Sequence, residues 1–180
     1  MNNEKSKSLR LAKMAMLVAI SIVLVMVVHF PIFPVVAFLE YDPADIPILI
    51  GTFAFGPGAG ILLTAVVSLL QGFTVSAQSG VYGIIMHILA TTTLVTVAGL
   101  IYRKHKTKKT AIIGLVAGTL AMAVVMFFAN MIITPMFTGM PLAAVMPLMP
   151  FIIAFNIVKA GINSIVTFLL YKRISPFLHR

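Results

Sequence analysis

The chain has 180 residues, of which 61% are hydrophobic and only 9% are charged. A soluble domain of this size carries about 25% charged residues, and fewer charges than that cannot cover a surface that faces water. The composition therefore excludes an ordinary soluble domain and predicts an integral membrane protein formed by one domain, residues 1–180. The absence of cysteine excludes disulfides and thiol catalysis.

Apolar runs, separated by breakers such as "HFPIFP", "GPGAG" and "TPMFTGMP", predict an all-α membrane protein with six transmembrane helices. The expected helices cover residues 9–28, 44–55, 59–73, 81–102, 111–133 and 147–172. The second of these is short, and an apolar run of that length is more typical of a re-entrant segment than of a span. The placement of the basic residues must therefore decide whether this helix crosses the membrane.

Basic residues flank the apolar runs, in the N-terminal segment, in the loop 103–109 and at the C-terminal end. Cytoplasmic loops collect Lys and Arg, so both termini and this loop are expected in the cytoplasm of a multi-pass cell-membrane protein. This arrangement requires the short helix to cross the membrane as a thin or tilted span. The formal net charge of +9 is then a topology signal, and binding to nucleic acid is not expected.

Three of the four acidic residues lie in the first outer loop, in "FLEYDPADIP". Asp42 suits a helix N-cap, Pro43 suits the first helical position, and Asp45 suits the positive end of the helix. Glu40 and Tyr41 precede this cap and are not explained by it. They are candidates to face a ligand from the loop.

A lysine lies in the middle of the last apolar run, in "FNIVKAGINS". Asn156, Lys159 and Asn163 are spaced i, i+3, i+7, so they share one helical face. A charge at the centre of a bilayer costs about 2.5–3.5 kcal/mol, and Lys159 is too far from either helix end to reach water easily. No acidic residue lies in the interior of an expected helix, away from its ends, to pair with it. A ligand pocket is the favoured interpretation, and amide contacts between helices remain open for the asparagines.

Further candidates in the outer half are polar or aromatic: Asn130, Phe127, Phe128, Phe155, Gln71 and Gln78. Flat apolar side chains beside amides suit a planar heteroaromatic ring with a polar edge. The glutamines, together with the outer loop, are candidates to hold a polar tail of the same ligand; the alternative is that both glutamines simply lie at the membrane interface.

The sequence contains no G-x-x-x-x-G-K-[ST] phosphate loop, no cluster with metal-ligand spacing and no nucleophile–base arrangement. We therefore expect no catalytic residues, no metal and no resident cofactor. His87 is the one histidine in an expected span, where a contact between helices is favoured over a proton relay. The pattern indicates a protein that binds a small molecule from outside without an energy source of its own.

The sequence resembles the substrate-binding S components of prokaryotic energy-coupling factor (ECF) vitamin transporters, and specifically the riboflavin-specific type. The resemblance covers nearly the whole chain and rests above all on "LEYDPADIPILIGTFAFGPGAG" and "FNIVKAGINSIVTFLLYKRISPFLH". It implies that riboflavin enters a pocket in the outer half from outside. It implies that Asn130, Asn156 and Lys159 contact the isoalloxazine edge, and that the loop with Glu40 and Tyr41 covers the ribityl side.

The resemblance also implies partner chains, namely a transmembrane coupling subunit and two ATPase subunits. Ala15 and Ala19, in "AMLVA", would form a small-residue patch that docks on the coupling subunit, because small residues let helices approach closely. Two alternatives remain open. One is an S component for another small vitamin; the other is a self-sufficient secondary carrier or small channel, which the lack of a carboxylate inside any expected helix disfavours.

Overall fold

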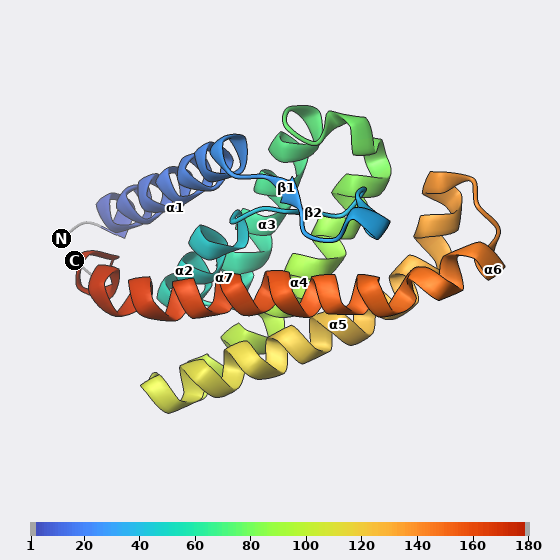
Figure 1. Ribbon diagram of the computed structural model, residues 1–180. Helices are drawn as coiled ribbons and strands as arrows, with labels where there is room; N and C mark the ends of the chain where they lie inside the picture. Colours follow the sequence, from blue (N-terminus) through green and yellow to red (C-terminus); the bar gives the residue numbers. More distant parts are fainter. Residues whose placement is uncertain (1–2, 179–180) are drawn as a thin grey trace.

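The computed structural model describes residues 3–178, which form helices arranged around a short central one (Figure 1). The elements, in chain order, are α1 (Asn3–Val27), β1 (Phe30–Pro31), η1 (Pro34–Val36), β2 (Glu40–Tyr41), α2 (Asp45–Phe55), α3 (Pro57–Phe73), η2 (Ala77–Ser79), α4 (Gly80–Lys104), α5 (Lys108–Thr138), α6 (Leu142–Val145), η3 (Met146–Leu148) and α7 (Met149–Leu178). Four stretches are long and apolar enough to cross a membrane: Lys7–Val27, Ala77–Lys104, Lys108–Thr138 and Leu142–Arg173. The prediction of a mainly helical membrane protein is therefore confirmed.

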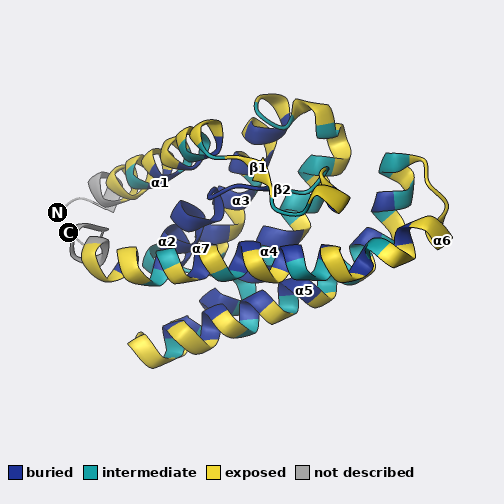
Figure 2. Ribbon diagram, in the orientation of Figure 1, coloured by how far each residue is buried: buried dark blue, intermediate teal, exposed yellow. Residues whose placement is uncertain are grey.

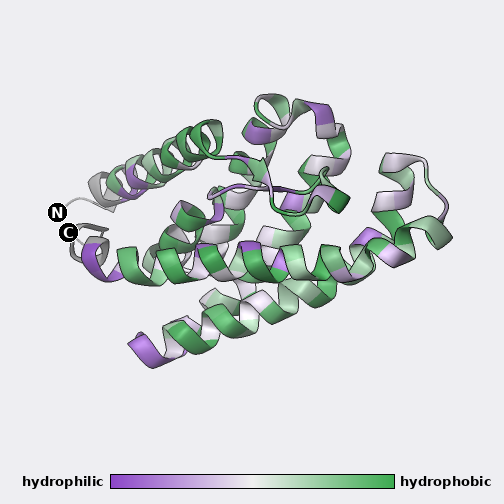
Figure 3. Cartoon of the chain, in the orientation of Figure 1, coloured by the Kyte–Doolittle hydropathy of each residue, from purple (hydrophilic) through white to green (hydrophobic). Residues whose placement is uncertain are grey.

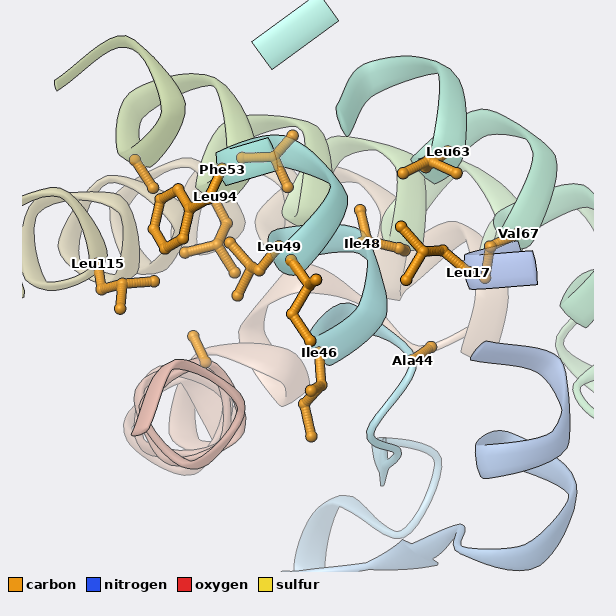
Figure 4. Packing of buried hydrophobic residues seen from close by; sticks show 14 of the residues in the cluster. Leu17, Ala44, Ile46, Ile48, Leu49, Phe53, Leu63, Val67, Leu94 and Leu115 are labelled. Carbon is orange, nitrogen blue, oxygen red and sulfur yellow. The ribbon is translucent and has the colours of Figure 1, made fainter. Parts of the chain in front are cut away.

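The short helix α2 is buried on every side. Its residues from Ile46 to Phe53 are all buried, and it packs against α1, α3, α4 and α7 (Figure 2). A helix that is apolar all round is stable only when neighbours surround it. Figure 4 shows how the side chains of α2 reach Leu17 of α1, Leu63 of α3 and Leu94 of α4. Helix α2 therefore forms the centre of the bundle, with its neighbours packed around it.

Helix α1 lies at the edge of the bundle and contacts α2 and α3 (Figure 1). Its inward face carries Leu17 and Ser21, which are buried, whereas Ala15 and Ala19 are exposed on its outer face. Near its start, the Arg10 guanidinium donates a hydrogen bond of 3.2 Å to the carbonyl oxygen of Phe55. A cation beside the last carbonyls of α2 is favourable, and this contact fixes α1 against the end of that helix.

Helices α4 and α5 approach closely at two glycines of α5 that lie one turn apart. A Cβ atom at Gly114 would lie 2.8 Å from the carbonyl oxygen of Ala98, and one at Gly118 would lie 2.8 Å from that of Leu94. Only glycine allows the two backbones to come this near. Because α5 also packs on α7, this approach sets the distance between the helices that form the cavity walls described below.

The predicted end of the fifth helix, before Thr134, is wrong. Helix α5 continues through Pro135 and ends at Thr138, and its C-cap residue Gly139 adopts a left-handed conformation with φ of 72°. A proline inside a helix removes one backbone hydrogen bond, and neighbouring helices in a membrane protein tolerate this. The connection to α7 is correspondingly shorter than predicted and contains α6 and η3.

A two-stranded ladder folds the first loop over the bundle. β1 and β2 are antiparallel, with Phe30 opposite Tyr41 and Pro31 opposite Glu40. Between them, Val36 of η1 is fully buried in a small apolar cluster with Val145 and Met149. The ladder places the residues that follow β2 directly at the start of α2.

The start of α1, the start of α5 and the end of α7 lie at the same end of the molecule (Figure 1). Hydrophilic residues gather at this end of the helices, while their middle portions are mainly hydrophobic (Figure 3). Helix α6 lies at the opposite end.

Candidate ligand-binding site

An open cavity lies between the first loop and helices α3, α4, α5 and α7. Its empty space, including the mouth, is about 1040 Å³. Its apolar lining includes Phe38, Met122, Met126, Ile133, Phe137 and Phe155, and its polar lining includes Glu40, Asp42, Gln71, His87, Asn130, Asn156 and Lys159. This combination of apolar walls with a few polar groups is typical of a binding site for a small, mostly apolar ligand.

Lys159 forms a buried ion pair with Asp42. The distance between Lys159 Nζ and Asp42 Oδ2 is 2.7 Å, and the two residues are only 8% and 4% exposed. The expectation that Lys159 has no acidic partner is therefore wrong. The partner comes from the loop before α2 and not from a helix interior, so helical spacing gives no sign of it.

Asp42 is held by several donors besides Lys159. Its Oδ1 accepts the backbone N–H of Ala44 at 3.0 Å, and its Oδ2 also accepts Gln71 Nε2 at 3.3 Å. Burial raises the pKa of the Asp42 carboxyl, but the Lys159 ammonium and the hydrogen bonds from Lys159 and Ala44 lower it by more, so the pKa lies below its ordinary value. Asp42 therefore stays ionised beside the lysine.

The predicted side-chain hydrogen bond of Asp42 is present, since its Oδ1 accepts the backbone N–H of Ala44, but the helix is assigned from Asp45 onward. The N-cap of α2 is Ala44, which provides no side-chain hydrogen bond, and Pro43 precedes the helix. The two carboxylate oxygens of Asp42 thus have different partners, with Oδ1 at the start of the helix and Oδ2 at Lys159. Asp45 lies in the first turn of α2, as predicted. There its Oδ1 accepts the hydroxyl of Thr91 at 2.6 Å.

Asn163 and Tyr41 lie behind the cavity wall and not on its surface. The Asn163 amide donates to the backbone oxygen of Asp42 and to Asp45 Oδ2, each at 3.1 Å. Its Oδ1 accepts the Tyr41 hydroxyl at 3.0 Å. Burial raises the pKa of the Tyr41 phenol, and the nearby Asp42 carboxylate raises it too, so the hydroxyl remains a donor. The structure thus gives both residues a supporting position, although the sequence suggested ligand contact.

Four of the predicted residues do line the cavity: Glu40, Asn130, Asn156 and Lys159. Both asparagine amides donate to a carbonyl one turn earlier in their own helix. Asn130 Nδ2 lies 2.7 Å from the oxygen of Met126, and Asn156 Nδ2 lies 2.8 Å from that of Ile152. These bonds hold the amides in fixed orientations, which is the arrangement a preorganised site requires.

Phe128 and Gln78 do not line the cavity. Phe128 is 60% exposed on the outside of α5. Two residues along a helix correspond to a rotation of about 200°, so Phe128 lies on the opposite side from Asn130. Gln78 is exposed in η2. Phe127 packs against the small apolar cluster around Val36, and Phe155 alone of the predicted phenylalanines lines the cavity.

His87 makes the contact between helices that the sequence favoured. Its Nδ1 lies 2.7 Å from the hydroxyl oxygen of Ser68 on α3, and its Nε2 lies 3.7 Å from Asp45 Oδ1. His87 also lines the cavity, as do Met122 and Met126 of α5. The two methionines are four residues apart and share one face. Nothing in the sequence distinguishes them from ordinary packing residues, so they were missed.

The fold and the cavity define a membrane protein that binds a small molecule. The chain belongs to the family described as the substrate-specific component of ECF transporters, whose sequence model matches residues 9–171. This family consists of transporter components and not of enzymes.

Named relatives cover almost the whole chain. The "Riboflavin transporter RibU" of Staphylococcus aureus (strain TCH60) is 34% identical, over 100% of this chain and 96% of the relative. The "Riboflavin transporter FmnP" of Bacillus subtilis (strain 168) is 27% identical, over 95% of this chain and 94% of the relative. A solved structure, "Structure and mechanism of the S component of a bacterial ECF transporter", superimposes with a TM-score of 0.85 at 34% identity, over 97% of this chain and 99% of that one.

The buried ion pair generates a prediction about stability. Lys159→Met leaves the Asp42 carboxylate buried without its main partner, which should cost about 3–5 kcal/mol. The double variant Asp42→Asn/Lys159→Met removes both charges and should recover most of the loss. Thermal unfolding of the detergent-solubilised protein measures both effects.

Lys172→Met is the matched control, because Lys172 is exposed near the end of the same helix. We expect this variant to unfold at nearly the wild-type temperature. A Lys159→Met protein as stable as the control, or a double variant no better than the single one, would show that the pair does not support the fold.

Proposed function

We propose that this chain is the substrate-binding S component of an ECF-type ABC vitamin importer and that it captures riboflavin from outside the cell. The observation that carries the proposal is the 34% identity to a riboflavin transporter over the full length of the chain. The cavity supports it, because its lining combines apolar walls with amides and one ammonium group.

The lining suits the isoalloxazine ring of riboflavin. Met122, Met126 and Phe155 offer apolar surface to a flat ring, and Asn130 and Asn156 offer amides to its polar edge. The ammonium of Lys159 has three N–H donors, and one of them is directed to Asp42. A second donor is therefore available to a carbonyl oxygen of the ring without loss of the ion pair. In this arrangement Glu40 lies on the ribityl side, at the loop.

The proposal predicts that the purified chain alone binds one riboflavin, which quenches flavin fluorescence and colours the protein yellow. Asn156→Ala should weaken this binding roughly tenfold, because a buried hydrogen bond to the ring is lost. A fluorescence titration measures both, and the thermal midpoint without ligand controls for folding. Tighter binding of another vitamin in a panel would instead favour an S component for that vitamin.

We propose further that residues 1–180 form one membrane domain with six spans and both termini in the cytoplasm of a prokaryotic cell. The common location of the start of α1, the start of α5 and the end of α7 supports this topology (Figures 1 and 3). Helices α2 and α3 would cross as a short pair. A thin span is tolerated at α2 because protein, and not lipid, surrounds it.

Cysteine labelling tests the topology, since the chain has no cysteine of its own. A cysteine in place of Thr107, which is exposed between α4 and α5, should resist an impermeant maleimide in intact cells and react after permeabilisation. A cysteine in place of the exposed Gln78 is the control and should react in intact cells. Labelling of both sites from outside would refute six spans.

Import against a gradient requires an energy source, and the sequence has no phosphate loop for ATP. We therefore propose that a transmembrane coupling subunit and two ATPase subunits complete the transporter. The exposed small residues Ala15 and Ala19 on the outer face of α1 are the proposed docking patch. A partner there can contact α1 closely without touching the cavity lining.

Replacement of both alanines by leucine should abolish riboflavin uptake in cells that hold the partner subunits, because the bulky side chains keep the partner helix away. Riboflavin binding by the purified variant should stay unchanged. Loss of binding together with uptake would mean that the alanines pack internally. Accumulation of riboflavin by the wild-type chain alone in vesicles would instead indicate a self-sufficient carrier.

A further inference from the structure

Gln71, near the end of α3, has a buried acceptor that the protein leaves unpaired. The residue is 7% exposed and lines the cavity. Its Nε2 donates to Asp42 Oδ2 and to the hydroxyl oxygen of Ser76, each at 3.3 Å. Its Oε1 is buried, and no group within residues 3–178 donates to it. Buried side-chain acceptors of this kind are uncommon and require an explanation.

The orientation of the Gln71 amide is set by the ion pair beside it. If the amide were flipped, its carbonyl oxygen would face the Asp42 carboxylate, and two acceptors would repel each other. Lys159 holds that carboxylate in place at 2.7 Å. Both N–H groups of Gln71 Nε2 therefore donate to Asp42 and Ser76, and Oε1 is the atom left without a partner. Gln71 thus presents a fixed acceptor that a ligand donor would satisfy.

The surroundings of Gln71 indicate which part of a ligand lies there. Ser76 and Ser79, from the connection between α3 and α4, also line the cavity, and Glu40 lines it from the loop. The surfaces provided by α5, by contrast, are mostly apolar, with Met122 and Met126 among them. A flat ring is favoured on the apolar side, and a hydroxylated chain is favoured on the side of α3.

We infer that Gln71 is a specificity-determining residue whose Oε1 accepts a hydrogen bond from a hydroxyl of the ligand's polyhydroxy chain. This inference rests on the proposed function, since riboflavin supplies both the ring and the hydroxylated chain. The inference places the ligand's hydroxylated chain beside α3, whereas Asn130, Asn156 and Lys159 remain available to the ring. A ligand with the same ring and no hydroxyl groups gains nothing from Gln71.

The test compares two flavins on matched variants. Lumiflavin has the riboflavin ring with a methyl group in place of the ribityl chain. Gln71→Met keeps a side chain of similar length and removes the acceptor. Riboflavin affinity should fall about tenfold in this variant, whereas lumiflavin affinity should change less than about twofold. Gln78→Met, the same substitution at an exposed glutamine outside the cavity, should leave both affinities unchanged.

Both affinities are measured by fluorescence titration, with lumiflavin also measured by competition against riboflavin. An equal loss of both flavins in Gln71→Met would overturn the inference, because Gln71 would then act on the ring or through Asp42. Unchanged riboflavin affinity would overturn it as well. Failure of the wild-type protein to bind riboflavin is a separate outcome, and it would refute the proposed function on which the inference rests.

Discussion

The buried ion pair between Lys159 and Asp42 is the constraint on which the rest of the site depends. Two charges removed from water are costly, and their attraction compensates only when the geometry is close and further hydrogen bonds satisfy the remaining atoms. Here the Nζ–Oδ2 distance is 2.7 Å, and Ala44 and Gln71 donate to the same carboxylate. The pair therefore joins the middle of α7 to the loop before α2 and to the end of α3.

A second buried carboxylate extends this connection to the remaining helices. Asp45 accepts hydrogen bonds from Thr91 of α4 and from Asn163 of α7, and His87 lies 3.7 Å away while it contacts Ser68 of α3. The start of α2 is thus the point at which α3, α4 and α7 are linked by polar contacts. The remainder of α2 is buried among apolar side chains, apart from the hydrogen bond that Arg10 donates to Phe55 at its end. The cavity lies beside the polar layer, since Asp42 and His87 line it.

The features that could be predicted from the sequence are those that a single helix determines. The face shared by Asn156 and Lys159 follows from helical rotation, and the structure brings both to the cavity. Phe128 shows the limit, because a residue close to Asn130 in sequence points the opposite way. The partner of Lys159 could not be predicted, since Asp42 lies 117 residues away in an irregular loop. For the same reason Asn163, on the predicted face, is covered by the residues that precede and begin α2.

The short length of α2 and the lysine in the middle of α7 have one explanation. With 11 residues, α2 rises only about 16 Å, roughly half of the ~30 Å thickness of a bilayer core. Its first residue consequently lies deep in the molecule, and the preceding loop must descend to meet it. This descent brings the Asp42 carboxylate to the level of Lys159. One further turn at the start of α2 would move Asp42 by about 5 Å along the helix axis, beyond the reach of the ammonium. The length of α2 therefore sets the position of the loop that supplies the partner of Lys159, and both members of this pair line the cavity.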